Sequence, residues 1–155
     1  MRYAQLGDYL VLRLNAGEEV LAELRRFLFD NDVLGGSFLA WGAFSRVRLQ
    51  YNRLVEGTYR PEMLEIDRPV EVASLLGSIA NLNDEPAIHA HLVAGDDESH
   101  TYSGHLAAGI VGPTLEVIVN PLPRALHRTW NARLGVAVLD PEEVPEEAER
   151  LAAWP

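Results

Sequence analysis

Three histidines provide the most specific chemical signal in the sequence. His89 and His91 are two residues apart in the strand-like run 86–93, where successive side chains alternate between the two faces of a sheet. Both imidazoles therefore project from the same face. His105 lies in the following strand-like run, and a hairpin centred on Glu98 would place it directly opposite His91. The spacing thus predicts three imidazoles at one place on the sheet.

This convergence depends on the register of the hairpin. Directly opposed residues of antiparallel strands share a face, with Cβ atoms about 4.5–5.5 Å apart. The loop must contain an odd number of residues, such as 97–99, because a slip of one residue would send His105 to the other face. The alternative is that the histidines are ordinary core or surface residues of a strand. His100 and His127 are expected to be solvated rather than ligands.

Three neutral imidazoles with an open fourth position form a ligand set that zinc accepts in catalytic sites. Nickel, cobalt, iron and manganese fit the same set. The chain has no cysteine, so thiolate zinc sites, iron–sulfur clusters, disulfides and cysteine nucleophiles are excluded. We therefore expect a divalent metal, zinc in the first place, bound by His89, His91 and His105.

Four further side chains are candidates for a role beside such a metal. Glu116 could orient a ligand histidine or act as a base, or it could be a surface carboxylate or a partner of Arg128. Arg46, Arg48 and Arg128 could each bind a substrate carboxylate through two hydrogen bonds. Each could equally be an ordinary exposed residue, and the sequence does not decide between these roles.

The elements that must position these residues indicate an α+β fold. A helix is predicted from Glu18 to about Asn31, because apolar residues recur there at helical spacing. Gly42 is expected to mark a tight turn, and Gly112-Pro113 is expected to end a strand, so that 87–119 would form an antiparallel meander. Strands are predicted at 9–14, 37–41, 47–51, in two stretches between 58 and 82, and at 87–94, 101–111, 114–119 and 134–139.

Together these elements predict one domain over residues 8–139, followed by an acidic tail over 140–155 that forms a short helix or a partly ordered arm. We expect a mostly antiparallel, twisted sheet of about eight strands with one main helix packed on it. A hydrophobic fraction of 48% and a charged fraction of 23% are typical of a globular domain and exclude a disordered chain.

The charge balance argues against nucleic acid as a direct partner. The chain has 23 acidic and 13 basic residues, all of the latter arginine, and a net charge of -10. DNA binding depends strongly on cationic side chains, and the sequence has no basic run. The sequence also has no apolar run long enough to span a membrane and no leader pattern at its start, so a cytoplasmic location is expected.

Six short motifs occur along the chain: Gly17-Glu18, Gly42-Ala43, Leu75-Leu76-Gly77-Ser78-Ile79, His89-Ala90-His91-Leu92, Ser103-Gly104-His105-Leu106 and Thr114-Leu115-Glu116-Val117. Together they resemble the plant and prokaryote conserved (PPC) domain over roughly residues 8–139. The histidine motifs are the most specific part of this likeness. The resemblance implies an α+β homotrimer in which His89, His91 and His105 form a metal-binding unit. The chain differs from the family in having Ser103 where a first glycine is often found and in lacking the AT-hook by which plant members bind DNA.

Three functions are compatible with this resemblance. The first is a metal-binding homotrimer that recruits protein partners, as a regulatory module of a family linked to DNA-binding proteins. The second is an enzyme, because the architecture also resembles acetolactate decarboxylase, which implies a metal-dependent lyase or hydrolase acting on a small oxo-acid. The third is direct DNA binding by the trimer. The sequence leaves open whether the chain is catalytic.

Overall fold

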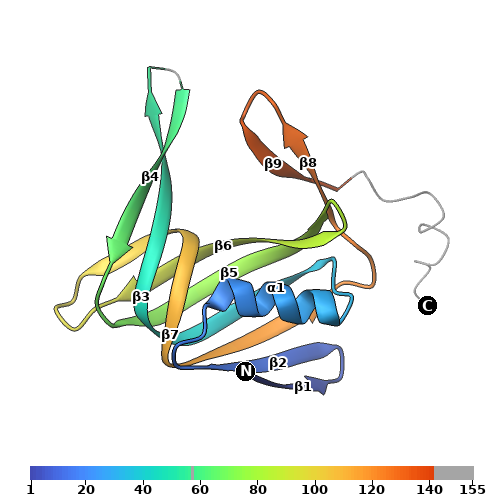
Figure 1. Ribbon diagram of the computed structural model, residues 1–155, viewed down its shortest axis with the longest axis horizontal. Helices are drawn as coiled ribbons and strands as arrows, with labels where there is room; N and C mark the ends of the chain where they lie inside the picture. The colour runs from blue at the N-terminus through green and yellow to red at the C-terminus, as the bar shows by residue number, and fades with distance from the viewer. Residues whose placement is uncertain (57, 142–155) are drawn as a thin grey trace.

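The computed structural model describes residues 1–56 and 58–141, which form a nine-stranded sheet and one helix (Figure 1). In chain order the elements are β1 (Arg2–Leu6), β2 (Tyr9–Asn15), α1 (Val20–Asp30), β3 (Gly36–Val55), β4 (Thr58–Ile66), β5 (Val70–Leu82), β6 (Glu85–Gly95), β7 (Thr101–Pro121), β8 (His127–Asn131) and β9 (Val136–Asp140). In the described part of the chain, no helix has the length and apolarity that a bilayer crossing requires. Most of the predicted acidic tail lies outside the described residues.

The sheet is mixed rather than purely antiparallel. Its order is β1-β2-β7-β3-β5-β8-β9, with β4 paired to β3 and with β6 paired to both β5 and β7. Every pairing between the described strands is antiparallel except that of β5 with β8, which meet at Asn81 and His127. The α+β class is therefore confirmed, and the sheet has one parallel contact and nine strands rather than about eight.

Helix α1 covers one face of the sheet (Figure 1). The carboxylate of Glu19 caps its first turn by accepting a hydrogen bond from the amide of Ala22 at 2.7 Å. The apolar stripe predicted from the sequence is the buried face of α1, and it forms one core with the inward residues of the strands. The buried helical residues are Val20, Leu21, Leu24, Phe27 and Leu28.

Two predicted strand breaks are wrong. β3 continues through Gly42, and β7 continues through Gly112-Pro113, so the segment 87–119 contains parts of two strands rather than three. The ladder between β3 and β7 shifts register near Gly42, as expected for bulges that let long strands bend without ending. A Cβ atom at Gly42 would lie 2.3 Å from the carbonyl oxygen of Thr114, which explains the need for glycine.

Two hairpins project from the body of the sheet in the same direction (Figure 1). One consists of the end of β3 paired with β4, and the other consists of β8 paired with β9. The sequence predicted a strand near β9, whereas β1 and β8 were not predicted. These two hairpins form the sides of the candidate site.

Candidate metal centre

The three histidines converge as the sequence predicts. His91 is the direct partner of His105 across the β6–β7 ladder, and Gly95 pairs with Thr101 where the two strands meet the loop. The hairpin is therefore centred on Glu98 with an odd-numbered loop. His89 precedes His91 by two residues on β6, so all three side chains share the face opposite α1.

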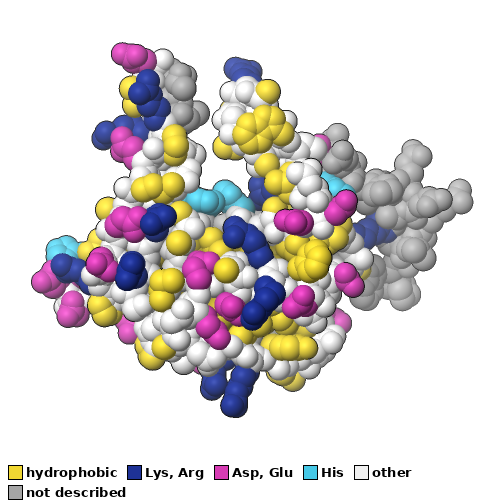
Figure 2. Space-filling view, viewed as in Figure 1, with side chains coloured by type: hydrophobic (Ala, Val, Ile, Leu, Met, Phe, Trp, Pro, Cys, Tyr) yellow, Lys and Arg dark blue, Asp and Glu magenta, His cyan; other side chains and the backbone are white. Residues whose placement is uncertain are grey.

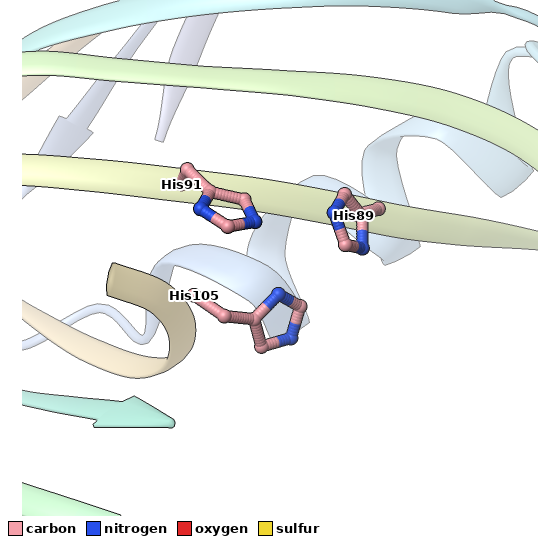
Figure 3. A group of neighbouring side chains, drawn as sticks. All are labelled: His89, His91 and His105. Carbon is pink, nitrogen blue, oxygen red and sulfur yellow. The ribbon is translucent and has the colours of Figure 1, made fainter. Parts of the chain in front are cut away.

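The imidazoles are close enough to hold one ion. One nitrogen from each ring can be chosen so that all three lie within 4.8 Å of one another. The ring centroids are 5.1 Å apart for His89 and His91, and 4.9 Å apart for His89 and His105. Figure 3 shows the rings of the two β6 histidines gathered with the ring from β7. Within residues 1–56 and 58–141, none of the three rings has a hydrogen bond to a protein group, so their nitrogen atoms are available as ligands.

The surroundings favour the neutral form of two of these rings. Burial lowers the pKa of His89, and His105, Arg128 and His91 lower it further. Burial also lowers the pKa of His105, with further contributions from His91 and Arg128. A metal ion binds the unprotonated nitrogen of imidazole, so the lowered pKa values favour the ligand form.

The histidines lie at the base of a hollow of about 660 Å³ between the two projecting hairpins. Figure 2 shows histidine side chains at the bottom of the notch that separates these hairpins. One side is contributed by β3 and the other by β8 and β9. The lining residues are Gln50, Tyr51, Asn52, His89, His91, Gly104, His105, Arg128, Val136, Ala137, Val138 and Leu139. Of the residues that the structure describes, no aspartate or glutamate lines the hollow, so the histidines are the natural metal ligands here.

Arg128 is the one arginine candidate that the structure brings to the histidines. Its side chain lines the hollow, where Nη2 donates to Oγ of Ser78 at 3.0 Å and Nη1 donates to the carbonyl of Ala137 at 3.1 Å. Ser78 is the direct partner of His89 across the β5–β6 ladder. The guanidinium is thus fixed beside the strand that carries two of the histidines.

The structure does not bring Glu116 to the histidines. Glu116 lies on the same strand as His105 but near its opposite end, because β7 does not turn at Gly112-Pro113. Its carboxylate accepts a hydrogen bond from Nε1 of Trp41 at 2.8 Å and lines a separate hollow beside β1 and β2. Glu116 therefore lies neither beside the three histidines nor in contact with Arg128.

Arg46 and Arg48 also lie away from the hollow. Arg46 forms an exposed ion pair with Asp67 at 3.0 Å, and Arg48 forms one with Glu65. Both pairs join β3 to the end of β4 or to the residue that follows it. These arginines therefore act as cross-strand partners rather than as residues of the candidate centre.

A family model for the Plants and Prokaryotes Conserved (PCC) domain matches residues 1–123. The chain belongs to this family. The match confirms the resemblance found in the sequence, and the solved structures agree. A candidate DNA-binding protein of Bacteroides thetaiotaomicron superposes with a TM-score of 0.84 at 23% identity, covering 91% of this chain and 97% of that chain. A metal-containing protein of Archaeoglobus fulgidus superposes with a TM-score of 0.76 at 26% identity, covering 90% and 98%.

This PCC-domain chain is also similar to part of a longer curated protein. The bifunctional protein GlmU of Synechococcus is 29% identical over 138 residues, which are 87% of this chain and 21% of GlmU. The chain thus spans about a fifth of the length of that relative.

Several residues of the PCC-domain hollow were not predicted from the sequence. Gln50 is the direct partner of His105 across the β3–β7 ladder, and Tyr51 donates a hydrogen bond from its hydroxyl to the carbonyl of Ser103. A Cβ atom at Gly104 would lie 3.1 Å from the Tyr51 ring, so this glycine makes room for the tyrosine. The alternation of residues 47–51 indicated a strand there. Because a break was predicted at Gly42, however, the sequence did not show that these residues belong to one long strand that pairs with the strand of His105.

A second group of possible ligands lies in the β6–β7 loop. Asp96, Glu98 and His100 each have a ligand atom within 4.8 Å of the others. Nδ1 of His100 lies 3.1 Å from Asp96, and Arg68 forms an ion pair with Glu98 at 2.8 Å. Ion pairs and hydrogen bonds within the chain thus already occupy this group. The remaining histidine, His127, is half-buried on β8 and does not line the hollow.

Proposed function

We propose that this PCC-domain protein is a metal-binding, self-associating module. His89, His91 and His105 bind one divalent ion, zinc in the first place, and leave a position open toward the hollow. The pairing of His91 with His105 is the observation that carries this proposal, because it brings the third imidazole to the pair on β6. The proposal is also supported by the metal-containing protein of Archaeoglobus fulgidus, which superposes on 90% of this chain.

The residues fit zinc better than a hard cation. Calcium and magnesium prefer several oxygen ligands, and the hollow offers no carboxylate among its described lining residues. Imidazole nitrogen suits zinc and neighbouring transition metals, and three such ligands leave the fourth position of a tetrahedral site open. Zinc is therefore the first metal to test.

An exposed apolar surface supports self-association. Leu39 and Leu76 are direct partners on β3 and β5, and their side chains are 40% and 57% exposed. Trp41 and Val93 are each 41% exposed, on β3 and on β6. Apolar side chains clustered in this way on the face opposite α1 are typical of an association surface. We propose that it joins the chain into the homotrimer that the family resemblance implies.

The module is proposed to act by recruiting protein partners, in the cytoplasm. Direct DNA contact by this chain is not proposed, because its net charge is -10. The association of the family with DNA-binding proteins then reflects partners rather than a basic surface of this chain.

One observation favours an enzyme as the second candidate. The histidines line an open hollow that also contains Arg128, rather than a closed surround of small residues. A bound divalent ion with an open position supplies Lewis-acid polarisation of a carbonyl or a lowered pKa of bound water. Arg128 would orient a small oxo-acid for a lyase or hydrolase reaction. Among the described lining residues, however, there is no carboxylate to act as a base.

Metal analysis of the purified protein, with molar mass from light scattering on the same samples, tests the proposal. We expect one ion per chain in the wild type, a large loss in His91→Ala, and wild-type content in the control His127→Ala. The expected mass of the wild type is three times the 17.2 kDa of one chain. Equal metal content in the wild type and His91→Ala would refute the site, and a monomeric wild type would refute the trimer.

A further inference from the structure

The hollow beside the histidines contains a cation that has no acidic partner among the described residues. Arg128 lines it, and no lining residue is an aspartate or glutamate. None of the ion pairs formed within residues 1–56 and 58–141 includes Arg128. Arg46 and Arg48, by contrast, are each paired with a carboxylate. A partly buried cation without a counter-ion favours the binding of an anion.

The guanidinium has donors left for such an anion. Of its five N–H groups, two are used by Ser78 and Ala137. Nε is buried without a hydrogen-bond partner. The two existing bonds fix the plane of the group, which reduces the conformational entropy lost when a ligand binds.

The position of Arg128 relates it to the proposed metal. Ser78, which anchors the guanidinium, is the direct partner of His89, and Arg128 lines the same hollow as all three histidines. An anion in this hollow would therefore lie close both to the guanidinium and to the histidines that would hold the ion. The hollow is also lined by the apolar surface of β9, with Val136, Val138 and Leu139.

We propose that this hollow binds a small organic carboxylate, held through its charge by Arg128 and through one oxygen atom by the ion on the three histidines. This inference rests on the proposed metal site. The apolar residues of β9 favour a ligand with a short aliphatic part, which inorganic phosphate lacks. Arginine is suited to the carboxylate because its planar fork can donate two parallel hydrogen bonds.

The residues proposed to bind the carboxylate, Arg128 and the apolar residues of β9, lie beyond the part of the chain that the family model matches. The match ends at residue 123, whereas Arg128 lies on β8 and the apolar wall lies on β9. The histidines thus come from the matched domain, and the residues that select the anion come from the hairpin that follows it.

The test uses protein loaded with cobalt(II), whose visible absorption reports a ligand entering the metal's coordination shell. Lactate and its neutral amide, lactamide, are titrated against the wild type, Arg128→Gln and the control Arg46→Gln, and affinities are measured by calorimetry. We expect the wild type and Arg46→Gln to bind lactate at least about tenfold more tightly than lactamide. Arg128→Gln should lose this preference while retaining its cobalt.

Other outcomes separate this inference from the metal site. Cobalt bound by the wild type, with equal affinity for lactate and lactamide, would overturn the carboxylate assignment and leave the metal site intact. A wild type that binds no cobalt would overturn both. Tighter binding of inorganic phosphate than of lactate would also overturn the assignment. If Arg128→Gln fails to fold, the comparison of lactate with lactamide on the wild type decides the matter without it.

Discussion

His91 and His105 face each other across the β6–β7 ladder, with ring centroids 5.6 Å apart. The loop between them sets this relationship. The amide of Asp96 donates to the carbonyl of His100 at 3.0 Å, and the amide of Ser99 donates to the carbonyl of Asp96 at 3.2 Å. Because a slip by one residue reverses the face of every side chain, these loop contacts help to keep the third imidazole beside the other two.

Zinc should stabilise the folded protein through the three histidines. At a free zinc concentration 100 times its dissociation constant, the free energy of unfolding of the wild type should rise by about 2.7 kcal/mol. His105→Ala should show little of this increase, because a ligand is lost, whereas His127→Ala should retain it. Urea unfolding with zinc and with a chelator measures the difference. The same stabilisation in wild type and His105→Ala would contradict the proposed centre.

Acid should weaken the β6–β7 loop through Asp96. Burial alone would raise the pKa of this carboxyl, but hydrogen bonds from the amides of His100 and Glu98 and from the side chains of Tyr102 and His100 lower it well below 3.8. The folded state therefore binds the Asp96 proton more weakly than the unfolded state does. The resulting stabilisation is fully present above about pH 3.8 and is lost as the pH falls toward the folded pKa.

Asp96→Asn tests this dependence. The wild type should be more stable than the variant at neutral pH, and the difference should shrink as the pH falls below the ordinary aspartate value. Asp97→Asn, at the exposed next position of the same loop, is the control and should keep the wild-type profile. Chemical unfolding at a series of pH values measures the difference. A gap between wild type and Asp96→Asn that stays constant with pH would count against this role of Asp96.

Truncation of two neighbouring leucines on β5 should affect two different properties, the stability of the fold and the assembly of the chains. Leu75 is 0% exposed in the core, so Leu75→Ala should lower the free energy of unfolding by about 2–5 kcal/mol. Leu76 is 57% exposed on the proposed association surface, so Leu76→Ala should mainly reduce the assembled mass. The unfolding midpoint of an assembling wild type should rise with protein concentration, and Leu76→Ala should weaken that dependence. An unchanged mass for Leu76→Ala would argue against this surface.

The isolated protein should not bind duplex DNA, even at low ionic strength. Its net charge is -10, and two arginines of the β3–β4 hairpin are paired with acids, Arg48 with Glu65 and Arg53 with Glu62. The excess of acidic side chains repels the phosphate backbone and opposes the release of counter-ions on which DNA binding depends. Fluorescence anisotropy with a labelled duplex over a range of salt concentrations tests this. Micromolar affinity that falls steeply with added salt would reverse the conclusion.

The parts of the fold that depend on local pattern could be predicted from the sequence. The apolar spacing of α1 gives its buried face directly, and the two-residue spacing of His89 and His91 places both on one side of β6. The breaks at Gly42 and Gly112-Pro113 could not be judged locally, because a bulge inside a long strand and a turn between two strands use the same residue types. Because a turn was expected at Gly112-Pro113, Glu116 was expected on the next strand beside the histidines, whereas it lies farther along β7.

By itself, the sequence determined the chemistry available and one face of the site. It contains no cysteine, and its histidines follow the alternation of a strand, so imidazoles were the natural metal ligands. Only the tertiary structure decided that Arg128, rather than Glu116, Arg46 or Arg48, lies beside them. That choice depends on the docking of β8 against β5, which joins residues far apart in the chain. Alternation along a strand is a property of neighbouring residues, whereas a hollow between two hairpins exists only after the sheet has assembled.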